Sequence, residues 1–326
     1  MESPQFMRKR KRTVGDHMAV PLMVGGATVL AFDIGRRVYR HTQLFCPSRE
    51  PAISWNPSDY GIPEGAVEEH WIETPDGELL HAWYCRAEKP VASGVFCHGN
   101  TGNLTNSADV IPLMLQAGFN VLYFDYRGFG KSTGIASFRG VISDGVTASR
   151  FHDKIRPKGL PSVLYGYSLG GGVAAQVIRR HPFDGLILQS TFTSLPKITR
   201  VLFPRFPLHL LAGNLFDTLS VIRNLQVPLL LMHGSEDEVC PCSMAHEIFD
   251  ACSAPKTIQV IEKGLHKNLH LCDPNAMIWA ISQFVASLPT PGRTFSVDEP
   301  PVIERWIDSV FGALRRWVRR KSPQPS

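Results

Sequence analysis

The sequence lacks the patterns that identify several classes of protein. Its 326 residues contain no internal repeat and no low-complexity tract in their central part, which excludes a repeat architecture there. The seven cysteines are an odd number without the spacing of a disulfide framework. Cys240-Pro241-Cys242 is C-x-C rather than C-x-x-C, and no second pair completes a zinc site. We therefore expect packing cysteines and no metal site.

Charge is also scarce in this chain. Charged residues make up 19% of the sequence, and much of the net charge of +5 lies at the two ends. The central part is therefore not a basic surface, and no nucleic-acid partner is predicted. A glycine-rich stretch at 125–132 lacks the G-x-x-x-x-G-K-S/T pattern of a phosphate-binding loop, so we interpret it as a structural turn.

What the chain does contain is enough apolar sequence for a full core. A hydrophobic content of 44% over this length favours one large α/β domain with appendages over two equal domains. Short apolar strands alternate with helical patterns, which predicts a mostly parallel sheet covered by helices on both faces. A strand-turn-strand unit is expected at 72–79, and further strands at 91–97, 121–125, 162–167, 185–189, 228–233 and 257–261.

The predicted organisation has an α/β domain with an extension on each side. The domain is placed at 67–290 and is preceded by a linker at 46–66. Residues 1–45 form a basic N-terminus with a short hydrophobic segment, and 291–326 form a basic amphipathic helix and tail.

The most informative stretch is Gly166-Tyr167-Ser168-Leu169-Gly170, which is followed by two more glycines. An apolar run precedes it, and the sequence at 173–178 predicts a helix. A serine between two glycines at a strand-to-helix turn is the pattern of a nucleophile elbow. Glycines leave room for the tight turn, and the hydroxyl is held above the helix amino terminus. Ser168 is therefore the predicted nucleophile.

A serine nucleophile needs a base, and the base needs an orienting acid. In this arrangement the acid follows the serine along the chain. Asp237, in a loop just past the strand at 228–233, is the predicted acid. Its neighbours Glu236 and Glu238 are interpreted as solvated loop charges.

The base is expected last in the chain, after the final strand. His266 occupies that place and is predicted to accept the serine proton. His270, about one helical turn later, is the alternative. His233 is expected to support the loop that carries Asp237.

Catalysis at a carbonyl also requires N–H groups that point to the developing oxyanion. The N–H of Leu169, directly after the nucleophile, is one predicted donor. The second is expected from the loop after an early strand, where Asn100 is the candidate. The same loop contains the glycosylation sequon Asn103-Leu104-Thr105, and a glycan there would obstruct the site.

Taken together, these motifs resemble the α/β-hydrolase superfamily, and more narrowly its membrane-associated abhydrolase-domain branch, related to serine aminopeptidase-like hydrolases. The resemblance covers about 67–288 and implies a Ser168–His266–Asp237 triad with no metal and no organic cofactor. Relatives include esterases, lipases, monoacylglycerol hydrolases and protein depalmitoylases, so the substrate stays open. The motifs that carry it are His98-Gly99-Asn100, Asp125-Tyr126-Arg127-Gly128-Phe129-Gly130, the elbow with Gly171, His233-Gly234-x-x-Asp237 and His266.

We therefore expect a serine-dependent hydrolase of carboxylic esters or thioesters, with a lipid or an acylated protein as substrate. The apolar segment at 202–211 is interpreted either as part of a small lid at 191–227, between the sixth and seventh predicted strands, or as an ordinary crossover helix. One alternative is a serine aminopeptidase-like peptidase, although no acidic pocket for a substrate amine is recognisable. Another is a non-catalytic membrane-associated interaction protein that retains the fold.

Both ends of the chain predict association with a membrane surface. A basic cluster at 8–12 precedes an apolar run at 18–32, which is typical of a signal segment or a short anchor. Apolar residues from Trp306 to Val318 share one helical face beside a basic end. Helices packed on the domain are the alternative for both segments, and the side of the membrane stays open.

Overall fold

The computed structural model describes residues 44–205, 208–213 and 215–288. Its centre is an eight-stranded sheet with the strand order β10-β9-β8-β7-β4-β6-β3-β2. Two very short strands, β1 (Cys46–Pro47) and β5 (Thr101–Gly102), pair separately. The strands of the large sheet are β2 (Val67–Glu73), β3 (Leu79–Cys85), β4 (Ala92–Cys97), β6 (Phe119–Phe124), β7 (Ser162–Tyr167), β8 (Gly185–Gln189), β9 (Leu229–Gly234) and β10 (Lys256–Ile261).

Most of the large sheet is parallel. The six strands from β10 to β6 run in one direction, and β3 pairs antiparallel with both β6 and β2. The β2–β3 hairpin turns at Asp76-Gly77, where Gly77 has a φ of 84°. Every residue of β4, β6 and β7 is buried, as expected for strands covered on both faces.

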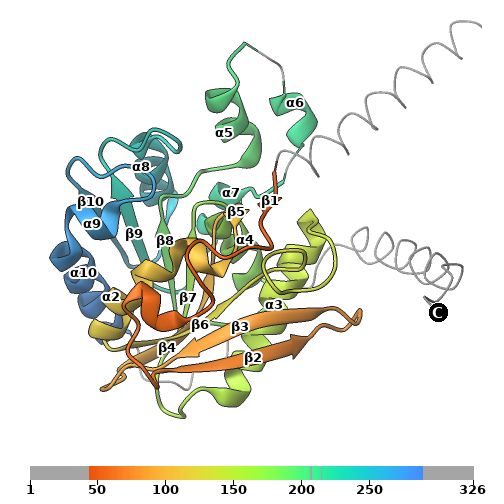
Figure 1. The fold of residues 1–326 in the computed structure, drawn as a ribbon. Helices are drawn as coiled ribbons and strands as arrows, with labels where there is room; N and C mark the ends of the chain where they lie inside the picture. Colours follow the sequence, from red (N-terminus) through yellow and green to blue (C-terminus); the bar gives the residue numbers. More distant parts are fainter. Residues whose placement is uncertain (1–43, 206–207, 214, 289–326) are drawn as a thin grey trace, which may run out of the picture.

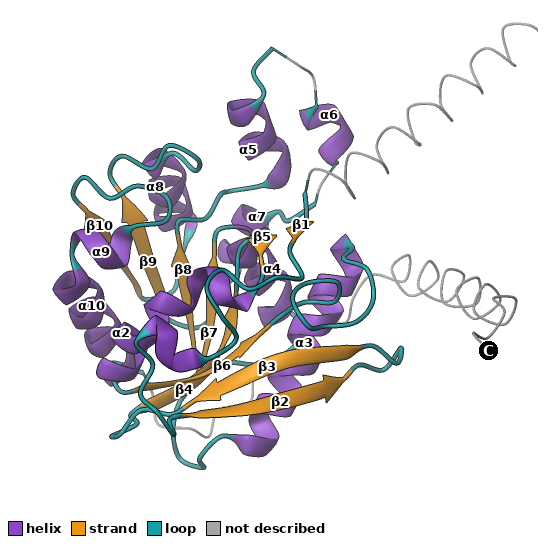
Figure 2. Cartoon of the chain, viewed as in Figure 1, coloured by secondary structure: helices purple, strands orange, loops and turns teal. Residues whose placement is uncertain are grey.

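Helices cover both faces of this sheet (Figures 1 and 2). Apolar side chains of α3, α4, α7 and α8 form one core with the sheet, and those of α2, α9 and α10 form the other. The mostly parallel sheet with helices on both faces, predicted from the sequence, is confirmed. The helices are α2 (Ile111–Gln116), α3 (Phe138–Ile155), α4 (Leu169–Ile178), α7 (Thr218–Ile222), α8 (Cys242–Ala251), α9 (Leu269–Cys272) and α10 (Pro274–Ala286), with the 3-10 helices η1 (Pro57–Tyr60) and η2 (Leu104–Val110).

The chain between β8 and β9 contains the segment for which a lid is predicted. It forms α5 (Leu195–Leu202), α6 (His209–Ala212) and then α7. Helices α5 and α6 stand away from the sheet at the top of the view (Figure 1). Leu202 and Leu210, on these two helices, are 44% and 59% exposed, so they leave apolar surface open to solvent.

The predicted membrane-associated localisation needs correction. In the residues that the structure describes, no helix combines the length and the apolar character needed to cross a bilayer. Even α3, with 18 residues, carries five charged side chains: Arg139, Asp144, Arg150, Asp153 and Lys154. The segments at 18–32 and 306–318, on which the prediction was based, lie outside the described residues.

A buried ion pair joins the sheet to α3. Arg127 and Asp144 have side chains that are 3% and 0% exposed. The Arg127 backbone N–H and its guanidinium both donate to the Asp144 carboxylate, at 2.6–3.1 Å. The guanidinium also donates to Asp76, which is half exposed. The pair therefore fixes the glycine-rich turn after β6 against α3.

We expect Asp144→Asn to lower the free energy of unfolding by about 3 kcal/mol, because it leaves a buried guanidinium short of its carboxylate. Urea unfolding followed by circular dichroism would measure this loss. Glu68→Gln is the matched control, since the Arg86–Glu68 pair is about half exposed on both sides and should contribute less than about 1 kcal/mol. Equal losses in the two variants would contradict the assignment of Asp144 as a structural anchor.

Candidate active site

Ser168 occupies the sharp turn between β7 and α4. Its φ of 53° and ψ of −119° are a strained combination for a residue with a side chain. Two hydrogen bonds hold this turn: the Ser168 N–H donates to Gln189 O at 2.9 Å, and the Thr191 hydroxyl donates to Ser168 O at 2.8 Å. The serine is therefore presented at the carboxyl end of β7, as the elbow pattern predicts.

The residues on either side of the elbow must be glycines, because the surrounding backbone leaves no room for a side chain. Gly166 and Gly170 are not among the residues with positive φ. A Cβ at Gly166 would lie 2.6 Å from Gly170 O, and one at Gly170 would lie 1.9 Å from Cys97 O. Side chains at either position would therefore push the helix away from β7 or from the end of β4.

The structure brings Ser168, His266 and Asp237 into one hydrogen-bonded chain. His266 Nε2 lies 2.9 Å from Ser168 Oγ, although the two residues are 98 positions apart in the sequence. On the other side of the ring, Nδ1 lies 2.9 Å from Asp237 Oδ2 and 3.0 Å from Oδ1. A carboxylate only accepts, so Nδ1 carries the proton and Nε2 is free to accept from the serine hydroxyl.

Asp237 is held by more donors than His266 alone. Its Oδ1 accepts the N–H groups of Val239 and Cys240 at 2.9 and 2.7 Å. His233 Nε2 lies 3.1 Å from Oδ2 and also donates to Cys240 O at 2.7 Å. Burial alone would raise the pKa of Asp237, but the hydrogen bonds from His233 and His266 outweigh it and hold the pKa well below its usual range. The carboxylate is therefore ionised and fixed in orientation.

Two of the neighbouring predictions differ from what the structure contains. Glu238 is not merely a solvated charge, because its Oε2 accepts the backbone N–H of His266 at 3.0 Å. His270, the alternative base, pairs with Asp109 at 3.0 Å instead of Ser168. A backbone contact such as that of Glu238 has no signal in the sequence. His233 lies 3.1 Å from Asp237, as expected for a residue that supports this loop.

The loop that follows β4, residues 98–105, lies beside the elbow, and we call it the oxyanion loop. A Cβ built on Gly99 would lie 3.6 Å from Ser168 Cβ. Asn100 comes next, and the first residue of α4 on the other side of Ser168 is Leu169. The first N–H groups of a helix have no partner within the helix. Leu169 therefore follows the serine directly, and Asn100 follows the glycine that lies against it.

The sequon in this loop is not compatible with glycosylation of the folded protein. Asn103 is 1% exposed. Its amide nitrogen donates to Ser48 O at 3.2 Å and to Glu50 O at 2.7 Å. A glycan on that nitrogen would remove both hydrogen bonds and would need space that the fold fills.

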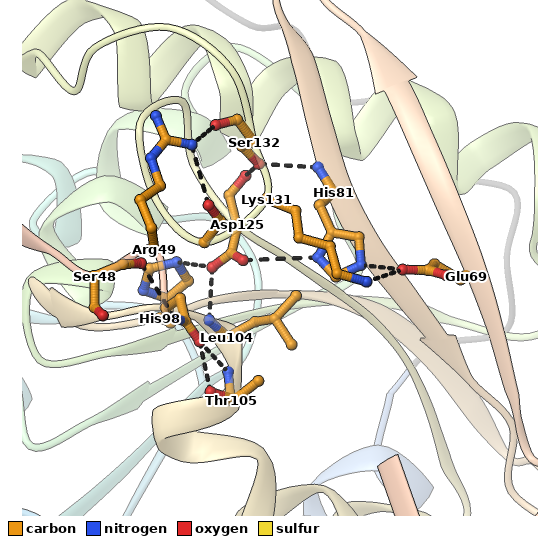
Figure 3. A network of polar contacts seen from close by, with 12 residues as sticks. Ser48, Arg49, Glu69, His81, His98, Leu104, Thr105, Asp125, Lys131 and Ser132 are labelled. Atoms are coloured by element: carbon orange, nitrogen blue, oxygen red, sulfur yellow. Dashed lines mark hydrogen bonds and ion pairs between the residues drawn. The ribbon is translucent and has the colours of Figure 1, made fainter. Parts of the chain in front are cut away.

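A buried carboxylate supports the oxyanion loop from the sheet side (Figure 3). Asp125, at the end of β6, accepts the Leu104 N–H at 2.6 Å. Its two oxygens lie 3.4 Å from His98 Nε2 and 3.7 Å from His81 Nδ1. His81 in turn contacts Glu69 at 2.6 Å, near the surface. The glycine-rich turn that begins at Asp125 is thus a structural support of the loop.

A second serine–histidine pair provides a contrast. His152 Nε2 lies 2.7 Å from Ser93 Oγ, and both residues are fully buried in the core. Burial lowers the pKa of His152 to about 3, and its Nδ1 has no hydrogen-bond partner in the described structure. This pair has no orienting acid and no access from solvent, so its geometry is that of a core contact. Within the described residues, no cluster of three or more His, Cys, Asp or Glu side chains could hold a metal ion.

Comparison with known proteins agrees with this geometry. The sequence matches the family of serine aminopeptidase, S33, over residues 88–225 and 216–273. It is 31% identical to the uncharacterized protein YfhR of Escherichia coli K12 over an alignment of 244 residues, which covers 68% of this chain and 83% of that protein. It is 30% identical to the lysophosphatidylserine lipase ABHD12 of Danio rerio, over 67% of this chain and 60% of that protein.

The fold is also that of a solved structure. The esterase Pf2001 of Pyrococcus furiosus superposes with a TM-score of 0.63 at 20% sequence identity, over 75% of this chain and 98% of that one. The predicted resemblance to the α/β-hydrolases is thereby confirmed. The chain belongs to the serine aminopeptidase S33 family of the α/β-hydrolase superfamily.

Proposed function

We propose that this protein is a serine hydrolase that cleaves carboxylic esters or thioesters through a covalent acyl-enzyme. The observation that carries the proposal is the continuous chain from Ser168 Oγ through His266 to Asp237, with a distance of 2.9 Å on each side of the ring. A serine is a poor nucleophile until a base accepts its proton, and this arrangement supplies that base. The strained elbow supports the proposal, since strain of this kind is concentrated at functional sites.

In the proposed first step, His266 Nε2 accepts the proton of Ser168 as Oγ attacks the acyl carbon. The oxyanion that forms is stabilised by the N–H groups of Leu169 and Asn100. The bond to the leaving alcohol or thiol then breaks, and His266 donates its proton to that group. Asp237 stabilises the imidazolium throughout because it stays ionised.

In the second step, water replaces the leaving group. His266 accepts a proton from the water, which attacks the acyl carbon of the ester formed with Ser168. A second tetrahedral intermediate forms in the same oxyanion site and collapses to the free acid, and the proton returns to Ser168. The reaction consumes one water per ester and needs no redox partner.

An apolar acyl group is the substrate feature we favour. Leu202 and Leu210, on α5 and α6, expose apolar surface on the segment predicted to be a lid. A relative at 30% identity is named a lysophosphatidylserine lipase, and lysophospholipids are esters of apolar acids. Both observations support an ester with an acyl chain longer than acetate.

For p-nitrophenyl esters, we expect kcat/KM to rise about tenfold or more from acetate to octanoate, because each buried methylene contributes about 0.8 kcal/mol. A series with even-numbered acyl chains at fixed pH would measure this, with the matched thioesters run in parallel. Values that stay flat or fall with chain length would contradict an apolar acyl site. The ratio between esters and thioesters would identify the preferred leaving group.

The direct test of a serine hydrolase is covalent labelling with a fluorophosphonate. The wild type should be labelled at Ser168, and Ser168→Ala should abolish the labelling. Ser93→Ala is the matched control, since Ser93 also contacts a histidine but is buried without an orienting acid, and this variant should label like the wild type. No labelling of the folded wild type would overturn the proposal and favour a non-catalytic role.

The family name makes a peptidase the second candidate. The same chain of three residues would cleave an amide, so the difference depends on the leaving group. Measuring amino-acyl p-nitroanilides beside p-nitrophenyl esters of the same amino acids separates the two functions. Our proposal expects the esters to be turned over and the anilides to be cleaved at a rate below detection.

A further inference from the structure

A segment that precedes the region matched to the family lies across the oxyanion loop. It comprises residues 44–52, and we call it the N-terminal strap; the family match begins at residue 88. Within it, β1 pairs in parallel with β5 of the oxyanion loop. The Cys46 N–H donates to Asn100 O at 2.8 Å, and the Ser48 N–H donates to Gly102 O at 2.8 Å. The strap thus holds the backbone of the residue expected to supply an oxyanion donor.

Side chains of the loop add to this backbone pairing. Asn103 donates its amide to Ser48 O and Glu50 O, while its Oδ1 accepts the Thr105 N–H at 3.0 Å. The Thr105 hydroxyl oxygen accepts the Ala52 N–H at 2.8 Å. Hydrogen bonds between strap and loop are therefore spread over the whole stretch from Asn100 to Thr105.

The strap is itself fixed to the body of the domain. Phe45 is 4% exposed, and its ring packs edge-on against Phe129 with a centroid distance of 6.4 Å. Arg49 Nη1 donates to Gly130 O at 3.0 Å and also to Ser132 O. In return, the Gly130 N–H donates to Ser48 O at 2.9 Å. Figure 3 shows Arg49 reaching the turn of Ser132 beside Asp125.

This arrangement encloses the oxyanion loop from two sides. Asp125 holds the Leu104 N–H from the sheet side, and the strap holds the carbonyl groups of Asn100 and Gly102 from the other side. Loops of this kind are otherwise the more mobile parts of a domain. An oxyanion donor lowers the barrier only if it is already in place when charge develops.

We propose that the N-terminal strap is a positioning element of the active site, which holds Asn100 where its N–H meets the oxyanion. This inference rests on the proposed function, because it assumes that an oxyanion forms at Ser168. The strap would help to stabilise the transition state and would not contribute to binding of the substrate in its ground state.

Cys46→Pro tests the proposal in the full-length protein, because proline lacks the N–H that Cys46 donates to Asn100. Cys46→Ala is the matched control, since it keeps the N–H and changes only an exposed side chain. We expect Cys46→Pro to lower kcat roughly 10- to 100-fold with KM unchanged, as a displaced donor does. Cys46→Ala should retain the wild-type kcat.

A transition-state analogue separates positioning from a loss of structure. A trifluoromethyl ketone with the acyl chain of the ester forms an oxyanion at Ser168, so its Ki should rise by the same factor by which kcat/KM falls. A kcat that falls while this Ki stays constant would overturn the proposal, as would a Cys46→Pro protein with wild-type kcat. Melting temperatures would show that each variant is folded at the assay temperature.

Arg49→Ala provides a second variant that leaves both the strap backbone and the loop intact. Arg49 is exposed, so its replacement should not prevent folding. Loss of its bonds to Gly130 and Ser132 should lower kcat about threefold to tenfold, again with a parallel rise in Ki. If the wild type neither labels nor hydrolyses esters, the proposed function fails; if it does both and neither strap variant changes kcat, only the strap proposal fails.

Discussion

Replacing Ser168 with alanine is expected to lower kcat for ester hydrolysis by roughly six orders of magnitude, as loss of a serine nucleophile does in comparable triads. The reason is that, in the described structure, no other hydroxyl group is hydrogen-bonded to His266 Nε2. Without Ser168, a covalent intermediate therefore cannot form. The fold should survive, because the substitution removes only a hydroxyl group and keeps Cβ. Initial rates at saturating ester, with melting temperatures measured in parallel, provide the test.

Ser93→Ala is the control for this experiment as well. It removes a hydroxyl group that is also hydrogen-bonded to a histidine, but at the buried amino end of β4. Its kcat should equal that of the wild type at temperatures where it is folded. A Ser168→Ala protein that keeps more than a tenth of the activity would show that the reaction does not pass through this serine.

The second large effect is expected for Asp237→Asn, with a loss in kcat of roughly 10³- to 10⁴-fold. The asparagine amide would donate to His266 Nδ1, which places the ring proton on Nε2. In that tautomer, Nε2 cannot accept the proton of Ser168. The melting temperature should change little, because the asparagine oxygen can still accept the N–H groups of Val239 and Cys240.

Glu236→Gln is the matched control, since Glu236 is the exposed acid next to Asp237 in the same loop. Its kcat should stay within about twofold of the wild type, as expected for a surface charge. A comparable loss in both variants would mean that activity depends on the loop as a whole and not on the Asp237 carboxylate that is hydrogen-bonded to His266.

Much of this fold can be predicted because parallel strands covered on both faces leave a clear pattern. The buried runs at 162–167 and 185–189 coincide with β7 and β8 as the structure has them. Since parallel strands end at the same edge of the sheet, the loops after β7, β9 and β10 meet there. This is why Ser168, Asp237 and His266 could be named from chain order and are found in contact.

The N-terminal strap has no signature in the sequence, which places 44–45 in the basic N-terminus and 46–52 in the linker at 46–66. A strand of two residues has no periodicity, and its pairing with β5 spans more than fifty residues of sequence. The sequon at Asn103 carries no sign that the structure buries its amide against the strap. Such hydrogen bonds depend on which backbone carbonyl groups lie nearby in the folded chain, and the local sequence contains no information about that.

The support beneath the oxyanion loop illustrates the same limit. The sequence predicts a structural turn beginning at Asp125, but not that its carboxylate lies between His81 of β3 and His98 of the oxyanion loop. No local pattern connects Asp125 to His81 or to the N–H of Leu104. The sequence therefore predicts the residues of the proposed triad better than those that hold them in place.

Rapid-quench mass spectrometry of the wild type during ester turnover would detect the proposed acyl-enzyme on Ser168. The peptide that contains Ser168 should gain the mass of the acyl group within the first turnover and lose it when the substrate is exhausted. Steady turnover with no acyl group on that peptide, or with the acyl group on another residue, would rule out an acyl-enzyme on Ser168.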